Sequence, residues 1–264
     1  MVLPYHILEA ATDGDTAGVE AYLDDARPLA VNEVDEEGQS LLMRSMRYKG
    51  ENIQFARRMI ERGADVNLCD PDEGYAPLHL ACYPGDRSAS MVLLLLQAGA
   101  RVNHRAQGGL SPLGQLLEVF DYNLYAVDDE FRVLDDDEYN LYAAIQRQVS
   151  SSGLEIMELL LRNGASLDRC REDLSAEECM QAFLTDHPHY ADDDYFTRCR
   201  ELVAGVRAHG SWKAMCLAPL KDFLRLRSLL VRGRAKTDSR RLERLARLPN
   251  GACWHVLSFL RDAA

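Results

Sequence analysis

The chain has 264 residues, 47% of them apolar and 27% charged, and its 42 acidic and 30 basic side chains give a formal charge of −12. This length and apolar fraction are enough to bury a substantial core, which excludes a generally disordered chain. The acidic average also disfavours a protein that binds nucleic acid or an anionic membrane over its whole surface.

The basic residues are concentrated near the C-terminus. Between Arg207 and Arg247, twelve Lys and Arg residues accompany three acids, so this segment carries +9 and the remainder −21. Few aromatic residues interleave the basic segment, so we do not expect it to bind nucleic acid. The acidic remainder predicts a partner protein with a basic surface.

No targeting or membrane-spanning sequence is visible. The longest apolar run is Met91–Leu96, whereas a membrane span needs about 20 residues. The N-terminal sequence has neither the basic flank nor the long apolar stretch of a secretory signal. The seven cysteines form no C-x-x-C pair, which predicts reduced thiols and a cytoplasmic or nuclear location.

Two short motifs recur with a common period. The first motif occurs as GADVN (63–67) and GARVN (99–103), with weaker copies LAVN (29–32) and GASLD (164–168). The second occurs as GQSLLM (38–43), GYAPLH (74–79) and GLSPLG (109–114). Successive full copies lie 35 or 36 residues apart. Two motifs that hold one period indicate a repeat architecture.

The unit Gly74–Asn103 carries the resemblance to a known family. It contains PLHLAC (77–82), an apolar second helix and Gly99, and it resembles the ankyrin repeat, whose pattern is G-x-T-P-L-H-x-A-A followed by L-L-x-x-G-A-D-V-N. A small or polar residue before proline is typical of a helix start, and a glycine after a helix is typical of its end. The resemblance covers about residues 5–170. It implies an all-α solenoid of helix-turn-helix units with hairpin tips, in which His79 bonds to the backbone of a neighbouring unit.

In chain order we expect four to five units within residues 1–210. Their approximate bounds are 4–34 (a degenerate cap), 35–69, 70–105, 106–170 and 171–210. The fourth unit is interrupted near residues 121–150 by an insertion whose core, Ala126–Glu138, contains seven acids. This insertion is either a solvated loop with a helical extension or an acidic recognition loop. The fifth unit has helical patterns at Ala176–Phe183 and Tyr195–Ala208, and we expect it to lack both glycine markers.

Residues 211–264 are expected to form a separate basic helical module that closes the solenoid. Pro219 is predicted to start its first helix, which Gly233 ends, and two further helices are predicted at Ser239–Ala246 and Ala252–Leu260. The module is too short to bury a core alone. Its simplest interpretation is a cap on the last repeat.

Two other interpretations of this module rest on family resemblance. The segment PLKDFLR (219–225), with Leu248-Pro249 downstream, resembles a SOCS box, which implies binding of the elongin pair. In that family Leu220 would stand at the insertion position and Leu224 replaces a cysteine. The segment from Leu248 to Leu260 also resembles the start of an F-box, which implies docking of Leu248, Pro249 and Trp254 on a Skp-type adaptor. Either resemblance would make the chain a substrate-recognition adaptor of a cullin-type ubiquitin ligase.

Motifs of catalysis are absent from the sequence. It contains no phosphate-binding glycine loop, nucleophile elbow or H-E-x-x-H motif. His187 and His189 with the acids 192–194 are the only plausible metal cluster, joined in principle by Cys179 and Cys199, but their spacing is not that of ligands. Cys82 is expected in the core. We therefore predict no enzyme activity, no cofactor and no metal.

The remaining expectation is a monomeric scaffold that binds a partner protein through the concave face of the solenoid. Candidate residues are those at the predicted tips and on the exposed side of the inner helices, where aromatic and charged side chains are typical of interfaces. They are Glu36, Asp72, Glu73, His104 and Arg105 at the tips, and Arg47, Tyr48 and Tyr83 on the inner helices.

Overall fold

The computed structural model describes residues 3–13, 15–25, 31–46, 53–83, 89–118 and 152–232. The chain divides into two compact parts, Met1–Val203 and Ala204–Ala264. Within the described residues the regular structure is helical, and extended pairing is limited to the isolated bridges Val34–Ser40 and Arg171–Leu174. None of the described helices is long and apolar enough to cross a membrane.

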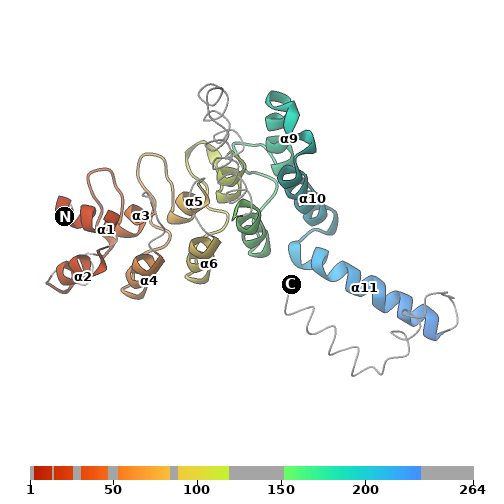
Figure 1. Ribbon diagram of the computed structural model, residues 1–264, viewed down its shortest axis with the longest axis horizontal. Coiled ribbons are helices and arrows are strands. Elements are labelled where there is room, and N and C mark those ends of the chain that lie inside the picture. The colour runs from red at the N-terminus through yellow and green to blue at the C-terminus, as the bar shows by residue number, and fades with distance from the viewer. Residues whose placement is uncertain are drawn as a thin grey trace, which may run out of the picture. The chain divides into compact units, whose positions relative to one another are not determined.

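The first part is a succession of helix pairs (Figure 1). Its helices are α1 (Tyr5–Asp13), α2 (Thr16–Asp25), α3 (Leu41–Arg44), α4 (Ile53–Glu61), α5 (Pro77–Cys82), α6 (Ala89–Gln97), two helices over 112–118 and 152–162, α9 (Ala176–Asp186) and the start of α10 (Asp194–His209). The 3-10 helices η2 (Gln107–Gly109) and η4 (Pro188–Asp192) lie between them. The predicted helical patterns at 176–183 and 195–208 are confirmed by α9 and α10.

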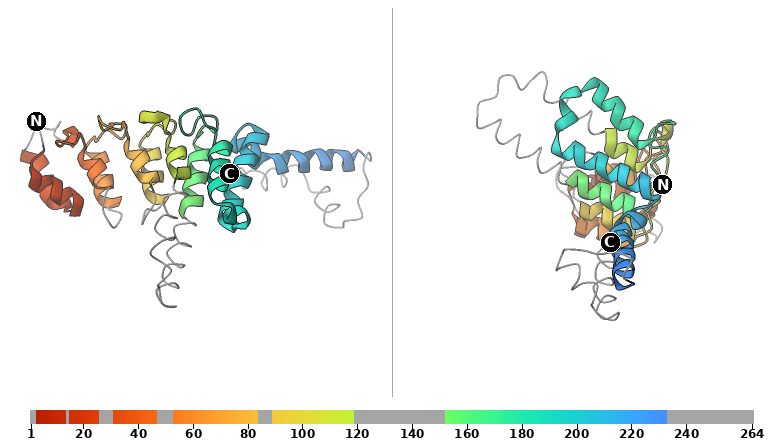
Figure 2. Two further views of the ribbon diagram at one scale, coloured as in Figure 1. Left: turned by 90° about the horizontal axis from the view of Figure 1, so that it is seen from above. Right: turned by 90° about the vertical axis from the view of Figure 1, so that its right-hand side faces the viewer.

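The helices of successive pairs form two rows. Helix α1 contacts α3 and α3 contacts α5 in one row, and α4 contacts α6 in the other. Viewed from above in Figure 2, these pairs follow one another in chain order. The large side chains between them are fully buried, among them Leu41, Phe55, Leu78 and Leu95. Burial of each contributes roughly 1.5–3 kcal/mol to folding, so the stacking of neighbouring pairs supplies the core.

Serine side chains cap the N-termini of several helices. The hydroxyls of Ser40, Ser111 and Ser175 accept hydrogen bonds from the backbone N–H groups three residues ahead, at 3.3, 3.0 and 3.3 Å. Helix α5 has Ala76 at its N-cap and Pro77 in its first turn. The glycines Gly63, Gly99 and Gly164 follow helices with φ of 91°, 91° and 86°, as predicted for the first marker.

The fifth unit lacks both repeated glycine motifs, but Gly210 still follows α10 with φ of 77°, as the other helix-ending glycines do. Its tip also keeps the backbone hydrogen bond of the other tips, because the N–H of Cys170 donates to the carbonyl of Leu174 at 2.8 Å. Glu172 has φ of 49° in this tip. This turn was not predicted, because a glycine was expected at a position with positive φ and Glu172 stands there instead.

The second part contains α11 (Trp212–Val231), whose predicted start at Pro219 is wrong. The helix begins at Trp212, where the Ser211 hydroxyl accepts from the N–H of Ala214 at 3.1 Å. Pro219 therefore lies inside the helix, although proline is disfavoured there because it lacks an N–H. The cap at Ser211 starts the helix, and this signal was missed. The helices predicted at 239–246 and 252–260, like the acidic insertion, lie outside the described residues.

Candidate functional site

The loops 35–39 and 70–75 are two of the tips, and an aspartate organises each of them. One oxygen of Asp35 accepts from the backbone N–H groups of Glu37 and Gln39 at 2.9 and 2.8 Å. Asp70 accepts from the N–H groups of Glu73 and Tyr75 at 2.7 and 2.8 Å. Hydrogen bonds from backbone N–H groups to an ionised carboxylate are among the stronger ones, so both loops are held in a defined conformation.

These loops present carboxylates to solvent. Glu36, Asp72 and Glu73 are all exposed, as expected for residues at a tip. The two aspartates that fix these loops were not predicted from the sequence. Their signal was an Asp three or four residues before the glycines Gly38 and Gly74, which have φ of 73° and 71°.

Arg44, on α3, ties its helix to the first tip. Its Nε donates to Asp35 at 2.6 Å and its terminal nitrogen donates to Glu37 at 3.2 Å. Asp35 is only 5% exposed, and this guanidinium supplies the counter-charge that a buried carboxylate needs. No sequence pattern singles out Arg44, because its ion pair with Asp35 joins residues nine positions apart across the turn of the loop.

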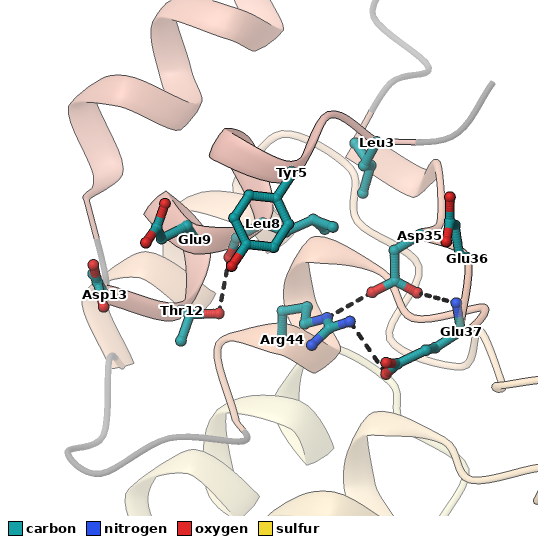
Figure 3. Close-up of a pocket in the computed structure, with 10 residues that line it drawn as sticks. All are labelled: Leu3, Tyr5, Leu8, Glu9, Thr12, Asp13, Asp35, Glu36, Glu37 and Arg44. Atoms are coloured by element: carbon teal, nitrogen blue, oxygen red, sulfur yellow. Dashed lines mark hydrogen bonds and ion pairs between the residues drawn. The ribbon is translucent and has the colours of Figure 1, made fainter.

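A groove of about 580 Å³ lies beside this ion pair, between α1 and the loop 35–39 (Figure 3). It is lined by apolar, aromatic and acidic side chains with one arginine, namely Leu3, Tyr5, Leu8, Glu9, Thr12, Asp13, Asp35, Glu36, Glu37 and Arg44. Of the predicted partner-binding residues that the structure describes, only Glu36 lies in this groove. The other described candidates on the tips and inner helices, namely Asp72, Glu73, Tyr83, His104 and Arg105, belong to the next unit.

Asparagine side chains connect the first motifs of successive units. Asn32 donates to the carbonyl of Gly63 at 3.1 Å and accepts from the N–H of Asp65 at 2.7 Å. Asn67 makes the same pair of bonds to Gly99 and Arg101 at 3.1 and 2.8 Å, and Asn103 makes it to Gly164 and Ser166 at 2.9 and 2.7 Å. We call this series the asparagine ladder. It explains the Asn of the repeated motif as a link between units.

His79 is the polar centre of the core beneath the second tip. Its Nδ1 accepts from the N–H of Ala76 at 3.2 Å, so Nε2 carries the proton and donates to the carbonyl of Leu110 at 3.1 Å. The predicted bond from His79 to a neighbouring unit is thereby confirmed. Burial lowers the pKa of His79 to about 4, so the imidazole is neutral at physiological pH.

The two predicted basic residues of the third tip bond within the array. Arg105 donates from its two terminal nitrogens to the carbonyls of Arg169 and Glu172 at 2.7 and 2.6 Å. The Nε2 of His104 donates to the carbonyl of Gly74 at 3.2 Å and also lies 3.2 Å from the Cys69 sulfur. Both side chains are half-buried. His104 and Arg105 therefore hold neighbouring tips together.

The other predicted site residues are dispersed. Tyr83 follows α5 as its C-cap and is 36% exposed. Leu220 and Leu224 lie on α11, where the Leu224 side chain is 36% exposed. The remaining predicted residues lie outside the described residues, namely Arg47, Tyr48, Leu248, Pro249 and Trp254.

The buried thiols show no sign of activation. Burial raises the pKa of Cys170 and of Cys199 to about 12 and also raises the pKa values of Cys69 and Cys179. The thiolate, which is the nucleophilic form, is thus disfavoured at these four positions. Cys82 is 1% exposed, as predicted for a core residue. Among the described residues, no three His, Cys, Asp or Glu side chains are grouped so as to hold a metal ion.

Comparison with protein families agrees with the repeat geometry. Residues 7–106 match the family model described as ankyrin repeats (3 copies). This stretch is an array of three ankyrin repeats. It runs from within α1 through α6 and includes the loops 35–39 and 70–75 and the first two rungs of the asparagine ladder. The ankyrin resemblance is confirmed over these residues.

No family model matches the C-terminal segment that resembles a SOCS box or an F-box, and a comparison with curated proteins finds no match. Ankyrin arrays are in general scaffolds for protein–protein interaction, because their stacked repeats create an extended binding surface. This general function is the one that the match supports.

Proposed function

We propose that the ankyrin array is a non-catalytic scaffold that binds a partner protein with a basic surface. The observation that carries the proposal is the row of exposed carboxylates on the first two tips, Glu36, Asp72 and Glu73, on loops fixed by Asp35 and Asp70. Rigid loops lose little conformational entropy on binding, so charges held in this way contribute more to affinity than mobile ones.

The electrostatic balance of the chain supports the same partner. Outside the segment 207–247 the sequence carries −21, and such a field speeds the association of a basic partner and repels an acidic one. Both ring nitrogens of the buried His79 are bonded to backbone groups, and burial raises the pKa values of Cys170 and Cys199, so these side chains are not available as a base or a nucleophile. Binding is therefore the activity that these side chains favour.

A capture experiment with charge reversal tests the proposal. The full chain is compared as bait with the double variant Asp72→Lys/Glu73→Lys and with Glu155→Lys/Glu158→Lys, which makes the same charge change at exposed positions of the helix 152–162. Proteins retained by the wild type and by the control, and lost from the tip variant, are expected to have basic surfaces. Equal recovery by all three baits would contradict the proposal.

A second candidate function is that of a ubiquitin-ligase adaptor. The observation that favours it is the apolar exposure of α11, where Leu224, Leu229 and Val231 are 36%, 42% and 68% exposed. Exposed apolar side chains on one helix are typical of a docking surface for another protein. In this proposal the ankyrin repeats hold a target and the C-terminal segment recruits the elongin pair or a Skp-type adaptor.

A further inference from the structure

The groove beside Arg44 has the properties of a docking site for an arginine side chain. Tyr5, Glu9 and Asp13 are spaced by four residues, so they share one face of α1. Ile7 and Ala11, on the opposite face of α1, are buried. Their burial sets the orientation of the helix, so that Tyr5, Glu9 and Asp13 line the groove. In Figure 3 the Tyr5 ring lies between Glu9 and Asp13 on one side and the loop 35–39 on the other.

The charges of the groove are unbalanced. Its lining contains five carboxylates and one guanidinium, a net charge of −4. That guanidinium, on Arg44, is already bonded to Asp35 and Glu37. Glu9, Asp13 and Glu36 add three further negative charges around the same space. An anionic ligand such as a phosphate or a nucleic acid would be repelled, whereas a cation would be attracted.

The arrangement favours an organic cation over a metal ion. Within the part of the chain that the structure describes, no three of these carboxylates are close enough to ligate one ion. A guanidinium is larger, has five N–H donors in a plane and can bond to separated carboxylates. Tyr5 is 78% exposed, so its ring face is available for a cation–π contact, and Leu8 can cover the apolar stem of the side chain.

We propose that this groove binds an arginine side chain, flanked by apolar residues, from an extended segment of the partner protein. The inference rests on the proposed scaffold function and names the chemistry that the first repeat recognises. Tyr5 stacks on the guanidinium, Glu9 beside the ring accepts its hydrogen bonds, and Asp13 and Glu36 add to the negative field around it. The Arg44–Asp35 ion pair remains intact and holds the wall of the groove.

Fluorescence polarisation with the full chain tests this site. The probe is a labelled peptide in which arginines alternate with leucines, and its reference is the same peptide with neutral citrulline in place of arginine. The variant Glu9→Gln/Asp13→Asn/Glu36→Gln is expected to weaken arginine-peptide binding about tenfold, since each exposed charge pair contributes modestly. Tyr5→Ala is expected to weaken it about two- to fivefold, and Tyr5→Phe to leave it nearly unchanged.

The matched control is Glu155→Gln/Glu158→Gln/Glu201→Gln, which removes the same charge from exposed positions elsewhere in the first part. It should change the affinity less than twofold. Equal loss in both triple variants, equal affinity for the citrulline peptide, or no binding of either peptide would overturn the inference.

This experiment and the capture experiment fail independently. If the groove variant binds the arginine peptide as the wild type does, while the Asp72→Lys/Glu73→Lys bait still loses its partners, the groove inference is wrong and the scaffold proposal stands. If the groove variant loses the peptide but the tip variant keeps all of its partners, the role assigned to the second tip is wrong and the groove stands.

Discussion

At the scale of single residues, His79 makes the stability of the array depend on pH. Its pKa falls from 6.5 to about 4 on folding because the imidazole is buried. A lowered pKa means that the unfolded chain binds the proton more tightly, so the contribution of His79 to stability is complete above pH 6.5. It is lost as the pH falls from 6.5 toward 4, at up to about 1.4 kcal/mol per pH unit.

Urea unfolding of the wild type and of His79→Gln, between pH 7 and pH 4.5, measures this effect. The wild type should be more stable at pH 7, and the difference should shrink as the pH falls. Carboxylates that titrate in the same range affect both proteins and cancel in the comparison, apart from the coupling of His79 to His104, whose charge lowers the pKa further. A difference that stays constant with pH would contradict the assignment.

The asparagine ladder gives a second prediction at this scale. Asn67→Ala removes two hydrogen bonds between neighbouring repeats and should lower the free energy of unfolding by about 1–2 kcal/mol. Asn163→Ala is the matched control, because that exposed side chain donates to Leu159 in its own helix. Chemical denaturation should separate the two variants, and equal stability would show that the ladder contributes nothing.

The ladder also shows how far residue patterns can be interpreted from sequence. The repeated Asn was visible as a motif, but its partners lie 31 to 63 residues away in the chain, and only stacking brings them together. Asp168 stands at the fourth position of the series. Since a carboxylate has no N–H to donate, it cannot form the same rung, and this difference could be predicted once the geometry of the others was known.

At the scale of elements, helices were predictable where a proline or a glycine marks one end. The helix at 77–82 was found from the proline in its first turn, and the helix at 89–97 from the glycine that follows it. The prediction failed at α11, because Pro219 was taken as a first-turn proline although Ser211 provides the cap. From the sequence alone, Pro219 could stand either in the first turn of a helix or inside a longer one. The hydrogen bond from the N–H of Ala214 to the Ser211 hydroxyl shows that Ser211 caps the start of the helix and that Pro219 is internal.

The internal proline of α11 makes a prediction about this helix. Pro219→Ala adds an N–H donor and removes a ring that clashes with the preceding turn, so it should stabilise the helix by about 1–3 kcal/mol. Amide hydrogen exchange across residues 212–231 should slow in this variant. Ala218→Gly, at the neighbouring position, should have the opposite effect, by about 1 kcal/mol. Faster exchange in Pro219→Ala would mean that the surrounding structure requires the proline.

At the scale of the whole molecule, the sequence predicted the repeat array and its acidity, but it did not predict the groove. The groove combines the exposed face of α1 with the loop of the next repeat, and no periodic motif marks either. Glu36 was singled out because tips are exposed. Tyr5, Glu9 and Asp13 were overlooked, because the first repeat departs from the family pattern and was treated as a cap.

The charge distribution predicts how partner binding responds to salt. If the acidic tips and the groove attract a basic partner, raising the ionic strength from low to physiological values should slow association more than it speeds dissociation. Surface plasmon resonance with a captured partner measures both rates. The Glu155→Lys/Glu158→Lys control should keep most of this salt dependence, and Asp72→Lys/Glu73→Lys should lose it. If salt changes only the dissociation rate, the contacts that respond to it are buried ones within the complex rather than the exposed charges.

The three interpretations of the C-terminal segment differ in what the full chain retains. Binding of the purified elongin pair is expected if α11 acts as a SOCS box, and Leu224→Asp should abolish it. Leu93→Asp is the matched control, since it makes the same change at a similarly exposed position of α6, outside the apolar surface of α11. Retention of the purified Skp-type adaptor, lost in Trp254→Ala, would favour the F-box interpretation.

If neither adaptor is retained by a chain that still binds its partner, the segment does not recruit a ligase through either adaptor, and the cap is the remaining interpretation. Deleting residues 211–264 should then lower the stability of the array without changing its affinity for the partner, because a terminal cap shields the apolar face of the last repeat and has no role in recognition.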